Sequence, residues 1–294
     1  MQKLRFALFG NIYQAKKSAS VHNLLQILEQ KQADIYIDKE FFMYMHQELN
    51  LDAHPKGLIE GDDFEADIAV CMGGDGTFLE AARRVGNKGI PIVGINMGRL
   101  GFLADIAPDE IENIIESIYQ NNYTTEERSV LQVETEGGDT LKGYPYALNE
   151  VAILKHDNSS MICIRVEVDG EYLTTYQADG LIASTPTGST GYAMSVGGPI
   201  MVPRSGIFGL TAVAPHSLNV RPLTISDNVV FSLTVESRSH NFLIAIDGRS
   251  ESCHESTKVI LRKAPYKIKV LKRANHSYFT TLRNKLMWGT DPRN

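Results

Sequence analysis

A short glycine-rich run contains the residue with the clearest chemical potential in the sequence. Gly73-Gly74-Asp75-Gly76-Thr77 follows an apolar segment that is predicted to be a strand, and it precedes a helical pattern. Glycines at such a junction let backbone N–H groups face a phosphate, and the helix N-terminus adds positive potential. Gly73, Gly74 and Thr77 are therefore candidates for a phosphate loop.

Asp75 is the unusual member of this loop, because a carboxylate among phosphate-binding groups repels phosphate. It makes chemical sense if it binds Mg²⁺, or if it accepts a proton from a hydroxyl that attacks the phosphate. The alternative, weighted equally from the loop alone, is that Asp75 caps the following helix, since Asp is a favoured N-cap residue. The run matches neither the dinucleotide fingerprint G-x-G-x-x-G nor the P-loop G-x-x-x-x-G-K-[ST].

A second polar segment begins at Asp179 and reads DGLIASTPTGSTGYAMSVGGPI. Its hydroxyl-bearing residues are Ser184, Thr185, Thr187, Ser189, Thr190 and Tyr192. Such a long run with few charges favours a ligand-binding loop, although a structural loop can also use hydroxyls to satisfy its own backbone. Asn149-Glu150 interrupts the apolar segment ALNEVAIL, and alternation along a strand predicts that one of the two points inward. In the alternative, Glu150 faces solvent and Asn149 marks a bulge.

The elements that must position these residues change character near residue 125. In residues 1–125, short apolar runs alternate with helical patterns, which predicts an α/β domain with a parallel sheet. The expected strands are 4–9, 34–38, 67–72 and 91–96, and the expected helices are 21–28, 41–49, 77–85 and 108–120. This domain contains the glycine loop.

Residues 126–274 are predicted to form a β-rich, β-sandwich-like domain. The expected strands are 130–136, 147–154, 162–168, 229–235, 242–246, 258–262 and 267–271. Asp169-Gly170 and Asp247-Gly248 are turn signals between strands. A short helix from about Ser277 to Met287 lies in the tail, about 275–294, which we expect to pack back on the first domain.

Composition excludes several classes of protein. The chain has 294 residues and a formal net charge of −6, and its hydrophobic content of 43% is typical of a globular protein. An acidic chain is a poor candidate for nucleic-acid binding. No apolar stretch approaches the length of a membrane span, and the N-terminus lacks the features of a signal peptide. The three separated cysteines predict neither a disulfide framework nor a zinc site, and favour a cytoplasmic location.

Five segments together make the chain resemble the bacterial NAD kinases. They are GGDGT at 73–77, GINMGRLGFLAD at 94–105, LNE at 148–150, DGLIASTPTGSTGYAMSVGGP at 179–199 and PHSLNVRPL at 215–223. GGDGT is shared with diacylglycerol and sphingosine kinases, whereas the 179–199 segment is much more specific. The resemblance runs from about residue 70 to 250, and it implies an α/β domain followed by a β-rich domain.

The resemblance also implies a reaction, in which the γ-phosphoryl group of ATP passes to the 2′-hydroxyl of the adenosine ribose of NAD and gives NADP. Asp75 aligns with the proton acceptor, Mg²⁺ arrives with ATP rather than in a protein-built site, and relatives form dimers or tetramers with shared sites. The positions implied to hold NAD are Asp75, Gly76, Asn149, Glu150, Gln177, Asp179, Thr190, Gly191, Tyr192, Ala193, Met194 and Ser195. Asn149 and Asp179 would hydrogen-bond the adenine and its ribose. Gln177 and Arg99 depart from the residues of some relatives.

Two alternatives come from other classes. GGDGT alone fits a lipid kinase, but the sequence shows no apolar acceptor pocket or membrane-facing surface. A non-catalytic dinucleotide sensor is the second alternative, but a sensor gains nothing from a carboxylate beside phosphate. Formation of NADP from NAD, ATP and Mg²⁺ discriminates among the three.

Overall fold

The protein is described by a computed structural model, which covers residues 3–10, 18–98, 101–157, 160–274 and 277–289. The chain divides into two compact units. The first comprises Met1–Glu127 and Ile268–Asn294, and the second comprises Arg128–Lys267.

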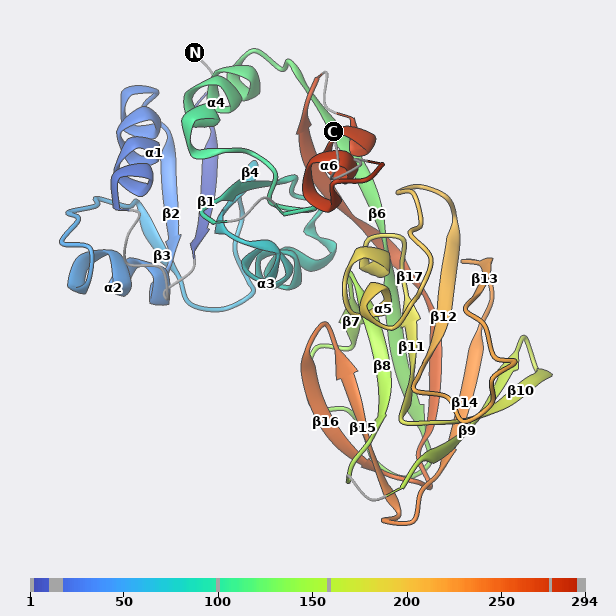
Figure 1. Cartoon of the computed structure of the whole chain (residues 1–294). Helices are drawn as coiled ribbons and strands as arrows, with labels where there is room; N and C mark the ends of the chain where they lie inside the picture. The colour runs from blue at the N-terminus through green and yellow to red at the C-terminus, as the bar shows by residue number, and fades with distance from the viewer. Residues whose placement is uncertain (1–2, 11–17, 99–100, 158–159, 275–276, 290–294) are drawn as a thin grey trace. The chain divides into compact units, whose positions relative to one another are not determined.

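The first unit is built on a parallel sheet with the strand order β5-β4-β1-β2-β3 (Figure 1). Its strands are β1 (Arg5–Gly10), β2 (Asp34–Asp38), β3 (Gly57–Ile59), β4 (Ile68–Gly73) and β5 (Ile92–Asn96). The end of β17 (Lys258–Arg273) pairs in parallel with β5 through Val270 and Ile92. In parallel sheets of this type, ligands bind beyond the carboxyl ends of the strands, which is where β4 leads into the glycine loop.

This unit has helices on both faces of the sheet and one helix that follows β17. They are α1 (Ser18–Gln30), α2 (Lys39–Gln47), α3 (Asp75–Val85), α4 (Ile111–Tyr119) and α6 (Tyr278–Leu286). On one face, α1 and α4 pack with the large inward residues of the strands, such as Leu8, Val70 and Val93. The residues that alternate with these include Gly94, where an added Cβ would lie 3.0 Å from a ring carbon of Phe78 in α3. A small residue in β5 therefore lets α3 pack closely on the sheet.

The second unit is a two-layer β-structure around one apolar core. One layer contains β7 (Tyr146–Ala147), β9 (Ile162–Val168), β10 (Glu171–Ala178), β14 (Phe231–Glu236), and parts of β6 (Tyr123–Glu136) and β17. The other is an antiparallel sheet of β13 (Leu223–Ser226), β12 (Ile207–Val213), β11 (Gly180–Ser184), β8 (Glu150–Lys155), β15 (Asn241–Ile246) and β16 (Arg249–His254). Buried residues of both layers, such as Phe208 and Phe231, share the core. The predicted fold class is confirmed.

Individual elements differ from the expectations in instructive ways. The two strands predicted at 258–262 and 267–271 are one continuous strand, β17, because Ala264 remains buried between them. The predicted segment 147–154 is divided into β7 and β8, with the break at Leu148 and Asn149. The 179–199 segment, which the sequence predicts to be a loop, begins with strand β11. The predicted turn at Asp169-Gly170 is confirmed.

The cysteines Cys71, Cys163 and Cys253 are all free thiols. Burial raises the pKa of the Cys253 thiol to about 11. In the part of the chain that the structure describes, none of the helices has both the length and the apolar character that crossing a membrane requires.

Candidate active site

The glycine loop lies at the carboxyl end of β4 and opens toward unfilled space. A Cβ at Gly73 would lie 2.3 Å from Oγ1 of Thr77, so packing requires glycine there. A Cβ at Gly74 or Gly76 would meet no atom within 4 Å. Gly76 lies in the first turn of α3, where glycine costs about 0.5–1 kcal/mol relative to alanine. Neither Gly74 nor Gly76 is needed by the protein's own packing, which fits a backbone that a ligand approaches.

The carboxylate of Asp75 is held by the backbone of the loop 101–104, which follows β5. Its Oδ2 accepts the N–H of Phe102 at 2.9 Å, and its Oδ1 accepts those of Leu103 and Ala104 at 3.0 and 3.1 Å. The N-cap of α3 is Gly74, and no side chain caps this helix end. The alternative that Asp75 serves as a helix cap is therefore wrong, and its carboxylate faces another loop.

Loop 101–104 is itself fixed in place. A Cβ at Gly101 would lie 2.1 Å from Oδ1 of Asp75, so only glycine allows this close approach. The N–H of Gly101 donates to the carbonyl of Ala104 at 3.1 Å, which closes the turn. Directly after the turn, Asp105 Oδ2 lies 2.7 Å from Nζ of Lys272 in β17, and both side chains are buried. The donors that hold Asp75 thus belong to a preorganised backbone.

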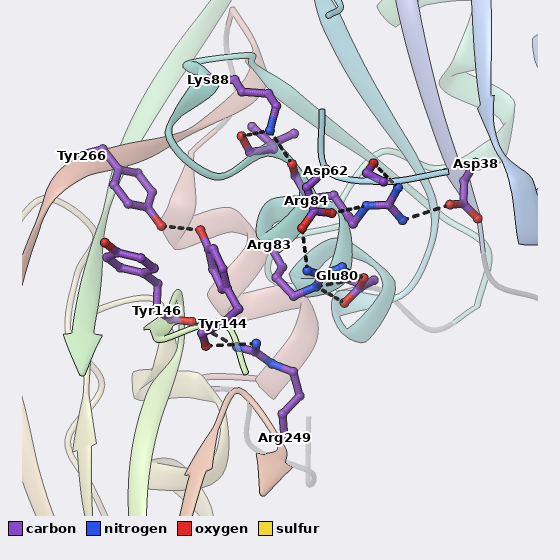
Figure 2. A network of polar contacts seen from close by, with 12 residues as sticks. Asp38, Asp62, Glu80, Arg83, Arg84, Lys88, Tyr144, Tyr146, Arg249 and Tyr266 are labelled. Atoms are coloured by element: carbon purple, nitrogen blue, oxygen red, sulfur yellow. Dashed lines mark hydrogen bonds and ion pairs between the residues drawn. The ribbon is translucent and has the colours of Figure 1, made fainter. Parts of the chain in front are cut away.

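Arginines on α3 anchor the helix that begins with Asp75 (Figure 2). Arg84 forms ion pairs with Asp38 at 3.1 Å and with Asp62 at 2.6 Å, and it donates to the carbonyl of Gly61. Arg83 contacts Asp62 and Glu80. The contacts with Asp38 and Asp62 fasten the last turn of α3 to the end of β2 and to the segment after β3, while the 101–104 backbone holds the first residue of the helix.

A second polar cluster lies at the start of β8 in the other unit. Asp247, in the turn between β15 and β16, accepts the backbone N–H groups of Leu148, Asn149 and Glu150 at 2.7–3.1 Å. The turn predicted at Asp247-Gly248 is confirmed. The sequence does not reveal that the Asp247 carboxylate holds the backbone of residues 148–150. An Asp-Gly pair predicts a turn, but it gives no sign that the side chain reaches another strand.

The side chains of Asn149 and Glu150 point inward and carry unused hydrogen-bonding capacity. Oδ1 of Asn149 and Oε2 of Glu150 are buried, and neither has a hydrogen-bond partner in the described structure. Burial and the nearby Asp247 carboxylate raise the pKa of Glu150 from 4.5 to about 7. Buried polar groups without partners are costly, so these two oxygens are candidates for contacts with a ligand.

The turn 188–195 adjoins these two side chains. It contains the 3₁₀ turn Gly188–Thr190 and the short helix α5 (Tyr192–Ser195). A Cβ at Gly191 would lie 2.9 Å from Oε2 of Glu150, and the backbone N–H of Tyr192 donates to the Glu150 carboxylate. The structure therefore brings Asn149, Glu150, Gly191 and Tyr192 together.

The other residues of this segment serve mixed purposes. Tyr192 and Ser195 are exposed, Thr190 and Met194 are half-buried, and Ala193 packs in a small apolar cluster. The interpretation of the hydroxyls as ligand groups is wrong for Thr185 and Ser189. Their buried hydroxyls donate to the carbonyls of Leu148 and Pro186, at 2.6 and 2.7 Å, and so stabilise the loop itself.

Asp179 lies at the opposite end of this sheet, directly before β11, and Gln177 lies near the end of β10 in the other layer. Strands β8 and β11 pair so that Glu150 faces Ser184, whereas Leu154 faces Gly180. Asp179 forms an ion pair with Lys155 at 2.8 Å, and with Gln177 it lines a cavity of about 860 Å³. One strand length thus separates Asp179 from Asn149 within the chain. Arg99, noted in the sequence, lies outside the described residues.

A tyrosine–arginine network supports the segment that precedes Asn149 (Figure 2). Arg249, two residues after Asp247, donates to the carbonyls of Tyr144 and Tyr146 at 3.2 and 3.0 Å. The hydroxyls of Tyr144 and Tyr266 lie 2.5 Å apart, and burial together with this contact raises the pKa of Tyr266. The turn carrying Asp247 and the segment leading to Asn149 are therefore tied together twice.

Comparisons with known proteins identify the family of this chain. The sequence models of the ATP-NAD kinase N-terminal and C-terminal domains match residues 6–123 and 148–273. The chain is 58% identical over 290 residues to an NAD kinase of Bacteroides fragilis, covering 99% of this chain and 100% of that protein. It is 41% identical to an NAD kinase of Porphyromonas gingivalis, covering 97% and 98%. The chain belongs to the ATP-NAD kinase family.

Solved structures show the same fold. A yeast NADH kinase complexed with NADH superposes with a TM-score of 0.89 at 18% identity, over 98% of this chain and 89% of that chain. An NAD kinase from Archaeoglobus fulgidus in complex with ATP superposes with a TM-score of 0.77 at 24% identity, over 97% and 99%.

Proposed function

We propose that this chain transfers the γ-phosphoryl group of ATP to the 2′-hydroxyl of the adenosine ribose of NAD, with Asp75 as proton acceptor. Membership of the family carries the overall reaction, which produces NADP from NAD and ATP. The observation that carries the role of Asp75 is its position beside two open glycines, at the start of α3. A carboxylate there can accept the hydroxyl proton beside a bound phosphate.

Asn149, Glu150 and the turn Thr190–Ser195 supply the NAD-binding groups in this proposal. The two unsatisfied oxygens are acceptors, which suit ribose hydroxyls and the adenine amino group. Gly191 leaves room beside both side chains, and exposed Tyr192 offers a ring and a hydroxyl at the rim. In this proposal residues 126–274 form the NAD-binding domain. Residues 1–125, with the tail from about 275, form the domain that carries Asp75 and the phosphate loop.

Gln177 and Asp179 enter the proposal through a second copy of the chain. Because one strand length separates Asp179 from Asn149, a single chain does not offer both to one NAD molecule at this end of the sheet. A homodimer or homotetramer lets the end of the sheet with Asp179 serve the NAD of a neighbouring copy. A dimer or larger species in solution, measured by light scattering, supports this arrangement, and a strictly monomeric active enzyme contradicts it.

Mg²⁺ enters with ATP in this proposal. Among the described residues, His, Cys, Asp and Glu side chains form no group of three or more that is arranged to hold a metal. The open space at Gly74 and Gly76 fits a metal–nucleotide complex, since Mg²⁺ commonly binds through substrate phosphates, water and one or two carboxylates. When bound with ATP, the ion would neutralise phosphate charge. A cytoplasmic location remains our proposal from cysteine usage.

The residues of the chain act mainly by positioning. Backbone N–H groups of the loop and the N-terminus of α3 orient the phosphates, and the 101–104 backbone orients Asp75 toward the attacking hydroxyl. The ribose oxygen forms a bond to the γ-phosphorus while the bond from phosphorus to the β–γ bridging oxygen breaks. The ribose proton passes to Asp75, and the electron pair of the broken bond leaves with ADP.

A coupled assay tests the proposal directly. The protein is incubated with NAD, ATP and Mg²⁺, and NADP is detected with an NADP-specific dehydrogenase. Asp75→Asn should retain NAD binding and lower kcat by about 10²–10⁴-fold, because it removes the proton acceptor. Activity close to that of the wild type in Asp75→Asn would overturn the assignment. Phosphorylated lipid as the product, or NAD binding without turnover, would support the lipid kinase or the sensor instead.

A further inference from the structure

The carboxylate of Asp75 has three hydrogen bonds and one ion-pair partner in this structure, and its side chain is about 30% exposed. A carboxylate offers about four lone-pair directions, two on each oxygen. Both positions of Oδ1 are used by the N–H groups of Leu103 and Ala104, and one position of Oδ2 by that of Phe102. The remaining side of Oδ2 faces Nζ of Lys285, at 3.5 Å. A proton acceptor needs a lone pair that faces the attacking hydroxyl, and the side of Oδ2 toward Lys285 is the one that no backbone donor occupies.

Lys285 is the partner that can leave. The three N–H donors belong to a backbone turn that is closed by Gly101 and Ala104 and followed by the buried Asp105–Lys272 ion pair. Lys285 instead lies in the last turn of α6 on a flexible stem, about 30% exposed, at the longest of the four distances. A lysine ammonium is a compact charge that can change partners by side-chain rotation alone.

The surroundings keep Lys285 close to the site after it leaves Asp75. Its Nζ lies 4.7 Å from the centre of the Phe102 ring, a cation–π distance. The Phe102 ring in turn lies 6.3 Å from that of Tyr278, at the start of the same helix. Phe102 thus donates its backbone N–H to Asp75, and its ring contacts the Lys285 ammonium. The ammonium therefore remains beside the loop 101–104 when its side chain rotates.

We propose that Lys285 is a catalytic residue whose ammonium moves from Asp75 to the γ-phosphoryl oxygens of ATP. This inference rests on the proposed function and adds a residue to it. The movement frees one lone pair on Oδ2 for the ribose proton. It also reduces the repulsion between Asp75 and phosphate. The Lys285 ammonium, which neutralises the carboxylate before ATP binds, is the group that then contacts the γ-phosphoryl oxygens.

The step balances with Lys285 protonated throughout. The ribose oxygen bonds to the γ-phosphorus, its proton passes to Oδ2 of Asp75, and the bond to the β–γ bridging oxygen breaks with its electron pair on ADP. Asp75 is then neutral and no longer attracts Lys285. The ammonium stays with the phosphoryl group in transit, where fixed positive charge stabilises the transition state. It returns to Asp75 when the carboxylate loses its proton to solvent.

The first test compares Lys285→Met with Lys285→Arg and a control on the same helix. Methionine keeps an apolar stem against Phe102 and removes the charge. We expect Lys285→Met to lower kcat by about 10²-fold and to raise KM for ATP, with KM for NAD unchanged within twofold. Lys285→Arg should keep most of the activity. The control Arg283→Met removes an exposed charge from α6 and should stay within twofold of the wild type.

Chemical restoration of the charge separates catalysis from packing. Lys285→Cys is alkylated with 2-bromoethylamine, which rebuilds an ammonium at nearly the length of lysine. Wild-type protein is treated in parallel, because half-buried Cys163 also reacts. We expect the alkylated variant to regain at least tenfold in kcat, and iodoacetamide, which adds no charge, to restore nothing.

Two outcomes would overturn the inference. One is turnover by Lys285→Met within twofold of the wild type. The other is failure of the aminoethyl group to restore a folded but inactive Lys285→Cys, with folding checked by its thermal midpoint. Failure of the proposed function is distinct from both, since the wild-type protein itself would then form no NADP.

Discussion

Nζ of Lys272 lies 2.7 Å from Oδ2 of Asp105, and both side chains are less than 5% exposed. This ion pair joins β17 to the residue directly after the turn that holds Asp75. Charges are buried at a high desolvation cost, which their mutual contact offsets only while both partners are present. The pair therefore makes the position of the 101–104 backbone depend on a strand far away in the sequence.

Removing one charge of this pair should destabilise the protein strongly. We expect Lys272→Met to lower the free energy of unfolding by about 3–5 kcal/mol, because it removes the cation that the buried Asp105 faces. The double variant Lys272→Met with Asp105→Asn should recover much of that loss. Urea denaturation of the wild type and of the two variants measures both effects. Equal stability of the single and double variants would contradict this account.

Gly76→Ala should separate stability from activity. The added Cβ meets no atom within 4 Å, and alanine is a better helix former, so unfolding should cost about 0.5–1 kcal/mol more. The same methyl group would occupy the space that we assign to phosphate, so KM for ATP should rise. Gly61→Ala is the matched control, since its Cβ is equally unhindered. Higher stability with unchanged KM for ATP in Gly76→Ala would remove this glycine from the phosphate loop.

Gly101→Ala should displace the Asp75 carboxylate without changing Asp75 itself. Its Cβ would lie 2.1 Å from Oδ1 of Asp75, so the carboxylate or the turn must shift by about 1 Å. A misplacement of that size costs up to about 10²-fold in rate. We expect kcat to fall and KM for NAD to stay constant, measured by the coupled assay. A variant with normal kcat would show that the close approach has no bearing on turnover.

Glu150→Gln should change how stability depends on pH. The pKa of Glu150 is raised from 4.5 to about 7, so between these values the unfolded chain releases the proton while the folded chain keeps it. The folded state therefore loses stability as pH rises through this window, by about 3 kcal/mol at most, and the loss is complete above pH 7. Glutamine carries no such penalty.

The comparison of thermal midpoints at pH 5 and pH 8 tests this prediction for the protein without NAD. Glu150→Gln should gain on the wild type as pH rises, and should at the same time bind NAD more weakly. A constant difference between the two proteins at both pH values would contradict the proposed burial of the Glu150 carboxylate.

The sequence predicted those parts of the molecule that short-range patterns determine. The spacing of Val21, Leu24, Leu25 and Leu28 predicts α1, and these four residues form its buried face. Asp34–Asp38 was predicted with its observed ends. Asp75 also lies where the sequence places it, between a strand and a helix, and the polar pair Asn149-Glu150 lies at the start of β8.

What could not be predicted depends on contacts between residues that are distant in the sequence. Asp247 reaches Asn149 across about a hundred residues, and Lys285 reaches Asp75 across two hundred. In the sequence, the hydroxyls of Thr185 and Ser189 resemble ligand-binding groups. The structure shows that they donate to backbone carbonyls and so stabilise a turn. The separation of Asp179 from Asn149 required the register between β8 and β11.

The four contacts around the Asp75 carboxylate also bear on how a kinase avoids wasting ATP. Water is the acceptor that always competes with the intended hydroxyl, and a base with an open lone pair would activate both. Here three backbone amides and the Lys285 ammonium surround the carboxylate, so few of its lone pairs are open to a water molecule that enters before ATP. The same three amides that orient the base thus limit its contact with water, which favours the ribose hydroxyl over hydrolysis of ATP.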